Sequence, residues 1–161
     1  MIAPRHSGAT NIDGSCPFVA ASSGDGWWWP EGLIPEPDQF ADFAADIQLP
    51  GLPSTASLNV TCGTWYSLWV NGVLLSHGPP REVPPWQYYD SVDLTAALQA
   101  GMNQIRIRAY HLGVDTQFHA ACMAGLMVAG EVAGTGWRID PGNRKFWRAE
   151  KSPAFLRGAP R

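Results

Sequence analysis

The sequence has little charge and almost no lysine. Its 161 residues include 11 Lys and Arg and 14 Asp and Glu, so only 16% of the chain is charged, against about 25% in an average globular protein. Lysine occurs only at Lys145 and Lys151. A chain with a formal net charge of −3 lacks the positive surface that neutralises phosphates, and this excludes a nucleic-acid partner.

Long apolar runs, a signal peptide and paired cysteines are lacking too. No stretch approaches the roughly 18 uninterrupted apolar residues of a membrane span. Residues 1–15 hold no apolar segment of the kind that a secretory signal needs. We therefore expect a cytoplasmic protein with no membrane partner. Cys16, Cys62 and Cys122 are odd in number and have neither CxxC spacing nor a nearby pair of histidines, so we expect free thiols, no metal site and no cofactor.

Local catalytic motifs are absent from the sequence. It contains no GxSxG nucleophile turn and no GxxxxGK[ST] phosphate loop, and its four histidines lie in unrelated segments. Asp90 and Asp93 are the closest candidates for a carboxylate pair, but a separation of three residues on a strand directs them to opposite faces. We interpret Asp90 as a turn-forming residue and Asp93 as a helix cap, and we assign no catalytic residue.

Alternation of apolar and polar residues is the dominant pattern that the sequence does contain, and it predicts strands. The expected strands cover residues 40–49, 56–62, 65–70, 73–76, 88–92, 105–109, about 121–132, and a last one from 137. Asn71-Gly72 lies between two β-prone runs and predicts a hairpin with a type I′ turn, because both central positions of that turn need positive φ. With one helical turn after Asp93 and no long amphipathic helix, the sequence predicts an all-β protein, an antiparallel β-sandwich of jelly-roll or related topology.

Composition divides the chain into three parts. Residues 1–26 are rich in Gly, Ser, Ala and Thr without periodicity and predict an irregular lead-in. Residues 27–150 hold the expected strands and form one sandwich domain. Residues 151–161 contain two prolines without a strand pattern, and we interpret them as the start of a linker.

Tryptophan is common, with 8 residues, and falls into two predicted sets. Trp65 and Trp69 flank the hairpin and are expected in the core. The adjacent Trp27, Trp28 and Trp29 cannot all face one core from a regular strand. We therefore expect them to form an exposed strip that serves as an interface and permits self-association.

A proline-stiffened loop supplies the candidate carbohydrate-binding residues Arg81, Trp86 and Tyr88. An aromatic ring can stack on the C–H face of a sugar, and arginine can donate hydrogen bonds to its hydroxyls. The alternative for Trp86 and Tyr88 is that they pack at the edge of the sandwich or against a neighbouring domain.

Several short motifs occur in a familiar order. They are WWPEG at 28–32, YSLWVNGVLL at 66–75, SHGPPR at 76–81, QYYD at 87–90 and DLT at 93–95. This order resembles the N-terminal galactose-binding-like β-sandwich of bacterial α-L-rhamnosidases and related glycoside hydrolases, over roughly residues 27–150.

The resemblance implies that the catalytic acid and base lie in a separate barrel of α-helices, which this chain cannot form. We therefore expect a non-catalytic, carbohydrate-associated accessory domain that supports the catalytic barrel of a rhamnosidase-like glycoside hydrolase. A rhamnose-containing glycan is its expected ligand. No cluster of Asp and Asn resembles a calcium site. Two alternatives stay open: a purely structural or interaction domain with no sugar affinity, and a small enzyme in its own right.

Overall fold

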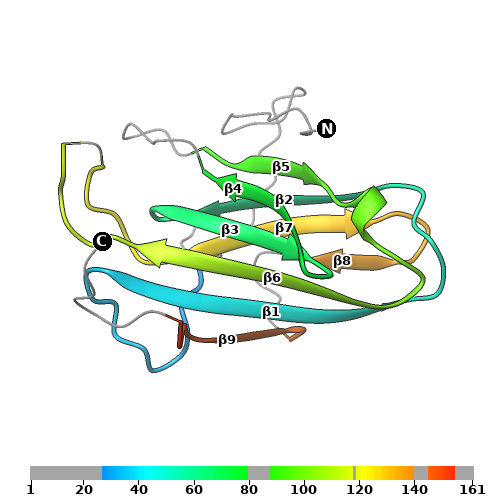
Figure 1. Ribbon diagram of the computed structural model, residues 1–161, viewed down its shortest axis with the longest axis horizontal. Helices are drawn as coiled ribbons and strands as arrows, with labels where there is room; N and C mark the ends of the chain where they lie inside the picture. Colours follow the sequence, from blue (N-terminus) through cyan, green and yellow to red (C-terminus); the bar gives the residue numbers. More distant parts are fainter. Residues whose placement is uncertain (1–26, 80–87, 118, 140–144, 155–161) are drawn as a thin grey trace.

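Two antiparallel sheets pack face to face in the computed structural model (Figure 1), which describes residues 27–79, 88–117, 119–139 and 145–154. One sheet has the strand order β4-β3-β6-β1-β9 and the other has the order β5-β2-β7-β8. The strands are β1 (Gln39–Leu49), β2 (Ala56–Cys62), β3 (Trp65–Val70), β4 (Val73–Gly78), β5 (Asp90–Asp93), β6 (Gly101–His111), β7 (Leu126–Val132), β8 (Trp137–Ile139) and β9 (Trp147–Lys151). The predicted β-sandwich is confirmed, whereas the finer galactose-binding-like topology stays a prediction.

Strict alternation along the strands builds the core between the two sheets. In β1, Phe43 and Ile47 point inward and are 1% and 2% exposed, while the intervening Ala44 and Asp46 point to the opposite face. Successive side chains of a strand project to opposite faces, so one apolar set becomes the core and one polar set becomes the outer surface. We use "outer face" below for the face of the five-stranded sheet that points away from the core.

The predicted hairpin joins β3 and β4. Asn71 has a φ of 50° and Gly72 a φ of 81°, as a type I′ turn requires. Asn71 has a second function, because its side-chain amide donates hydrogen bonds to the carbonyl of Ala97 at 2.9 Å and to Oδ1 of Asn103 at 2.8 Å. These bonds tie the hairpin to the 3-10 turn η2 (Thr95–Ala97) and to the beginning of β6.

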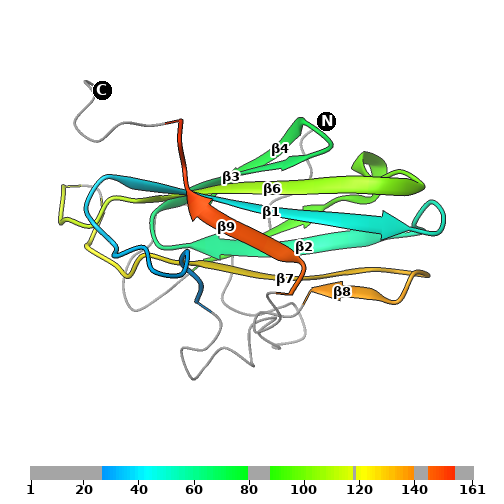
Figure 2. The same ribbon diagram turned by 90° about the horizontal axis from the view of Figure 1, so that it is seen from below.

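The strand pattern missed β9, which lies alongside β1 at the edge of the five-stranded sheet (Figure 2). Ala41 pairs with Lys151 and Ala45 with Trp147. Apart from Trp147 and Ala149, the strand is charged, so its short alternation gives little signal. Strand β7 begins at Leu126, later than expected, and β5 begins at Asp90.

Trp28 packs against both sheets of the sandwich. Its backbone exchanges two hydrogen bonds with Leu126, of 2.9 and 2.8 Å. Its indole lies edge-on to Phe43, with ring centroids 4.8 Å apart, and to Trp147, at 6.1 Å. Trp28 thus links β7 of one sheet to β1 and β9 of the other.

The neighbouring indoles are also half-buried. A Cβ at Gly125 would lie 2.7 Å from the ring of Trp27, so Trp27 packs directly on the glycine backbone. Trp29 donates from Nε1 to Oε1 of Gln39 at 3.1 Å. The expectation that Trp27, Trp28 and Trp29 form an exposed strip is therefore wrong, because adjacent residues reach two different apolar clusters. Their function as an interface stays a prediction.

The two tryptophans that were expected in the core lie on the outer face. Trp65 is 41% exposed and Trp69 is half-buried. The reason is the period of two in β3, where Tyr66, Leu68 and Val70 occupy the inward positions. The intervening tryptophans must then point outward.

A buried hydrogen bond joins the two sheets at their β4–β5 side. Tyr66 of β3 donates from its hydroxyl to Oδ2 of Asp90 in β5, a residue that is 1% exposed. The pKa of Tyr66 is raised, first by burial and then by this bond, so the hydroxyl stays protonated. Oδ1 of Asp90 has no partner in the described part of the chain, and a Cβ at Gly78 would collide with Oδ2. The interpretation of Asp90 as a turn residue is wrong.

We predict that Tyr66→Phe lowers the free energy of unfolding by about 1–3 kcal/mol, because it leaves a buried carboxylate without a donor. Tyr110→Phe is the matched control, since Tyr110 also donates to an aspartate, Asp38 at 3.0 Å, but in a part-buried position. Urea denaturation of both variants measures the difference. Equal losses of unfolding free energy in the two variants would contradict a stabilising hydrogen bond between the sheets at Asp90.

A second prediction concerns His111, at the end of β6. Its ring is 6% exposed, lies 6.0 Å from that of Trp29, and has no partner for Nδ1 within the described residues. Burial lowers its pKa from 6.5. Below about pH 6.5 the unfolded chain therefore binds more protons than the folded protein, so stability is lost as pH falls. We expect the free energy of unfolding to fall from pH 7 to pH 5. His111→Gln should flatten this slope, and an unchanged slope in that variant would contradict the assignment to His111.

Candidate functional site

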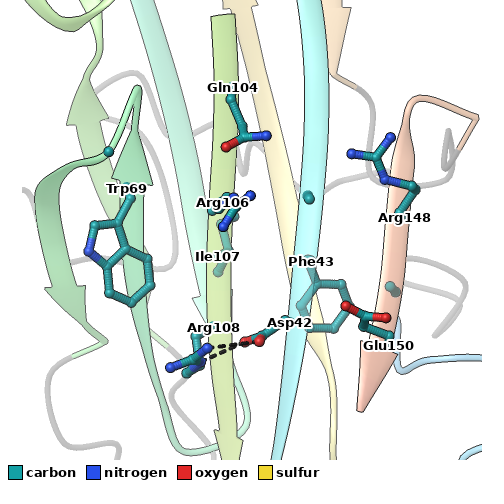
Figure 3. Close-up of a pocket in the computed structure, with 12 residues that line it drawn as sticks. Asp42, Phe43, Trp69, Gln104, Arg106, Ile107, Arg108, Arg148 and Glu150 are labelled. Atoms are coloured by element: carbon teal, nitrogen blue, oxygen red, sulfur yellow. Dashed lines mark hydrogen bonds and ion pairs between the residues drawn. The ribbon is translucent and has the colours of Figure 1, made fainter. Parts of the chain in front are cut away.

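A groove with a volume of about 460 Å³ crosses the outer face (Figure 3). We call it the outer groove and define it by six of the residues that line it: Asp42, Ala44, Trp69, Arg106, Arg148 and Glu150. These residues come from β3, β6, β1 and β9, so four strands of one sheet build the site.

Strand register explains why these side chains meet. Trp69 pairs with Arg106, Arg106 pairs with Ala44, and Ala44 pairs with Arg148. Residues that pair across neighbouring strands project from the same face of a sheet. The methyl group of Ala44 leaves a hollow between two long arginines, and this hollow is the floor of the outer groove.

The row beside it contains a fixed ion pair. Arg108 donates to both carboxylate oxygens of Asp42, from Nε at 2.6 Å and from a terminal nitrogen at 2.8 Å. Ser152 donates from Oγ to the same carboxylate at 2.9 Å. The bond to Asp42 raises the pKa of Arg108. A bidentate pair of this kind holds both planar groups in one geometry, so this wall of the groove is formed in advance of any ligand.

A second ion pair closes one end of the groove. Arg148 donates to Oδ2 of Asp46 at 2.7 Å, and Gln104 donates from Nε2 to Oδ1 at 3.1 Å. The bond from Gln104 and then the bond from Arg148 lower the pKa of Asp46. Both residues are substantially solvated, so this pair orients the Arg148 side chain more than it stabilises the fold.

Two charged groups of the groove face solvent. Arg106 and Glu150 are exposed and make no hydrogen bond or ion pair with the residues that the structure describes. Arg106 lies beside Trp69 on the neighbouring strand, and Glu150 lies across the groove on β9. The site therefore offers one free set of donors and one free pair of acceptors.

Trp69 presents a flat apolar surface at the opposite end from β9. In the described chain, the ring contacts of the outer face involve Phe40, Tyr110, Trp65 and His77, and none involves Trp69. Figure 3 shows its indole face-on over the sheet. An aromatic face with no protein ring against it is available to a ligand.

Of the three predicted sugar-binding residues, the structure describes only Tyr88. Arg81 and Trp86 lie outside the described residues. Tyr88 is half-buried before β5, its carbonyl accepts a hydrogen bond from Oγ1 of Thr61 at 2.6 Å, and it does not line the outer groove. Sugar binding by these three residues stays a prediction.

Sequence reasoning missed the residues of the outer groove, although part of the signal was present. Trp69 points outward because Tyr66 and Leu68 occupy the inward positions of the same strand. Arg106 already alternated with apolar residues in the predicted strand. Glu150 had no such signal, because its strand was not predicted.

No metal site or membrane-spanning helix is found within the described ranges. They contain no group of three or more His, Cys, Asp and Glu side chains that could hold an ion. None of their helices is long and apolar enough to cross a membrane. The thiol of Cys62 is buried and that of Cys122 is half-buried, and neither forms a disulfide among the described residues, whereas Cys16 lies outside the described residues.

No family model and no curated protein matches the sequence. Solved structures do resemble the chain. The chain is similar to the GH78 family rhamnosidase of Bacillus sp. GL1, with a TM-score of 0.66 and 29% identity over 78% of this chain and 13% of that one. It is similar in fold to the α-L-rhamnosidase of Streptomyces avermitilis complexed with L-rhamnose, with a TM-score of 0.55 and 17% identity over 82% of this chain and 13% of that chain.

A third similar fold is in the α-L-rhamnosidase of Aspergillus terreus, with a TM-score of 0.56 and 18% identity over 75% of this chain and 16% of that one. This chain thus spans only 13–16% of the length of the three enzymes. The sandwich corresponds to one part of much longer rhamnosidase chains, consistent with a domain of such enzymes.

Proposed function

We propose that this chain is a non-catalytic, sugar-binding β-sandwich domain of a rhamnosidase-like glycoside hydrolase. The observation that carries the proposal is the unstacked face of Trp69 beside the unpaired Arg106, on a sandwich similar to one part of rhamnosidase chains. The catalytic domain of the same parent protein is its proposed partner.

A sugar matches the chemistry of this end of the groove. One face of a pyranose ring carries C–H groups, which pack on an aromatic face, while its edge carries hydroxyls that accept hydrogen bonds from a guanidinium. Trp69 supplies the face and Arg106 supplies the donors. The Arg108–Asp42 pair holds the neighbouring wall in place, so little ordering is required when a ligand binds.

The arrangement of carboxylates supports a non-catalytic domain. Asp42 and Glu150 face each other on β1 and β9, but Asp42 is engaged by Arg108 and Ser152. A glycosidase needs one carboxylic acid whose pKa is raised so that it can protonate the leaving group. The carboxyl pKa values that the described structure shifts, those of Asp46 and Asp93, are both lowered by hydrogen bonds.

A purely structural domain is the second candidate, and one feature favours it. Phe40, Tyr110 and Trp65 form a row of ring contacts across three strands of the outer face, with centroids 4.5 and 5.0 Å apart. This row ends in Trp65, which is 41% exposed. Such an apolar ridge is suited to packing against another domain.

Calorimetric titration of the 161-residue chain with methyl α-L-rhamnoside at millimolar concentrations tests the proposed function. We predict measurable binding that weakens about tenfold or more in Trp69→Ala, because the stacking surface is lost, equivalent to at least about 1.4 kcal/mol. Trp65→Ala is the matched control on the same face and should bind normally.

If the unaltered chain gives no heat of binding, sugar binding is wrong and the purely structural domain remains as the function. Equal weakening in both tryptophan variants would place the sugar elsewhere. Hydrolysis of an aryl rhamnoside by the purified chain would contradict the non-catalytic part of the proposal.

A further inference from the structure

The outer groove runs across the strands rather than along them. Trp69, Arg106, Ala44 and Arg148 form one continuous row through β3, β6, β1 and β9, and Figure 3 shows the labelled members of that row spread from one side of the sheet to the other. Four strands are separated by three spacings of about 4.8 Å, so the row is about 14 Å long. A single pyranose ring stacked on Trp69 cannot reach the β9 end.

We infer that the outer groove binds a chain of at least two linked sugar units, laid across the strands. The inference rests on the proposed function and extends it. Trp69 and Arg106 hold the first unit, and Arg148 and Glu150 of β9 hold the next. Strand β9 is thereby the element that determines ligand length.

The β9 end has the polar groups that a second sugar needs. Glu150 pairs in register with Asp42, whose carboxylate is already bonded by Arg108 and Ser152. Glu150 is therefore the carboxylate of this pair that can accept a hydrogen bond from a ligand hydroxyl. Arg148 uses one terminal nitrogen on Asp46, and a guanidinium has five N–H donors in all, so further donors remain for the same ligand.

The β9 end offers acceptors and donors side by side. Glu150 is exposed and unpaired among the described residues, while Arg148 keeps N–H donors beyond the one used on Asp46. Sugar hydroxyls act as both donors and acceptors. A sugar unit can therefore bond Glu150 and Arg148 together.

Ala44 connects the two subsites. Its methyl group is the only side-chain atom beyond the backbone between Arg106 and Arg148 in their row. A longer side chain at this outward-facing, half-buried position would divide the groove without entering the core. Ala44→Gln is therefore expected to block a ligand that crosses β1 and to spare one that stays at Trp69.

Titration calorimetry with three probes tests the inference: methyl α-L-rhamnoside, an α-linked rhamnose disaccharide and the corresponding trisaccharide. We predict that the disaccharide binds at least tenfold more tightly than the monosaccharide. Ala44→Gln and Glu150→Gln should each bring the ratio of disaccharide to monosaccharide affinity close to one, while Ala44→Ser, a small substitution, should retain the gain. Thermal melting of each variant checks that it is folded.

The outcomes separate this inference from the function on which it rests. Equal affinity for the three probes, or a disaccharide gain that survives in Ala44→Gln, would overturn the two-subsite groove and leave sugar binding at Trp69 standing. Absence of binding by every probe would overturn the proposed sugar binding itself.

Discussion

The long antiparallel pairing of β1 with β6 is the constraint on which the rest of the structure depends. The two strands pair over eleven residues each, from Gln39 opposite His111 to Leu49 opposite Gly101. Because both strands bury one side, their register decides at once which side chains form the core and which form the outer face. A shift by one residue would exchange Phe43 with Asp42 and remove core and groove together.

Strands β3 and β9 extend the sheet on either side of the β1–β6 pair. Strand β3 joins β6 and adds Trp69 to the row of Arg106, and β9 joins β1 and adds Arg148 and Glu150. Burial of the inner face and the proposed binding on the outer face therefore share one cause. The Tyr66–Asp90 bond holds the two sheets together at one side, away from the groove.

The fold was predictable because most of it is encoded locally. Apolar alternation and the Asn71-Gly72 turn each act within a few residues, and they placed the first four strands and the hairpin correctly, whereas β7 begins later than expected and β9 was missed. The site was not predictable, because it depends on which strands become neighbours. Glu150 reaches the groove only through a pairing with residues more than a hundred positions away. Asp90 similarly became a buried partner of Tyr66 through the contact between sheets.

The central claim is that a sugar stacks on Trp69 at the outer face. The most direct test follows the indole N–H resonances of the eight tryptophans by two-dimensional NMR while methyl α-L-rhamnoside is added. We predict a saturable shift of the Trp69 resonance and no shift for Trp28 and Trp29, which pack on the sandwich itself. A shift confined to Trp86, or no shift at any indole, would contradict the account.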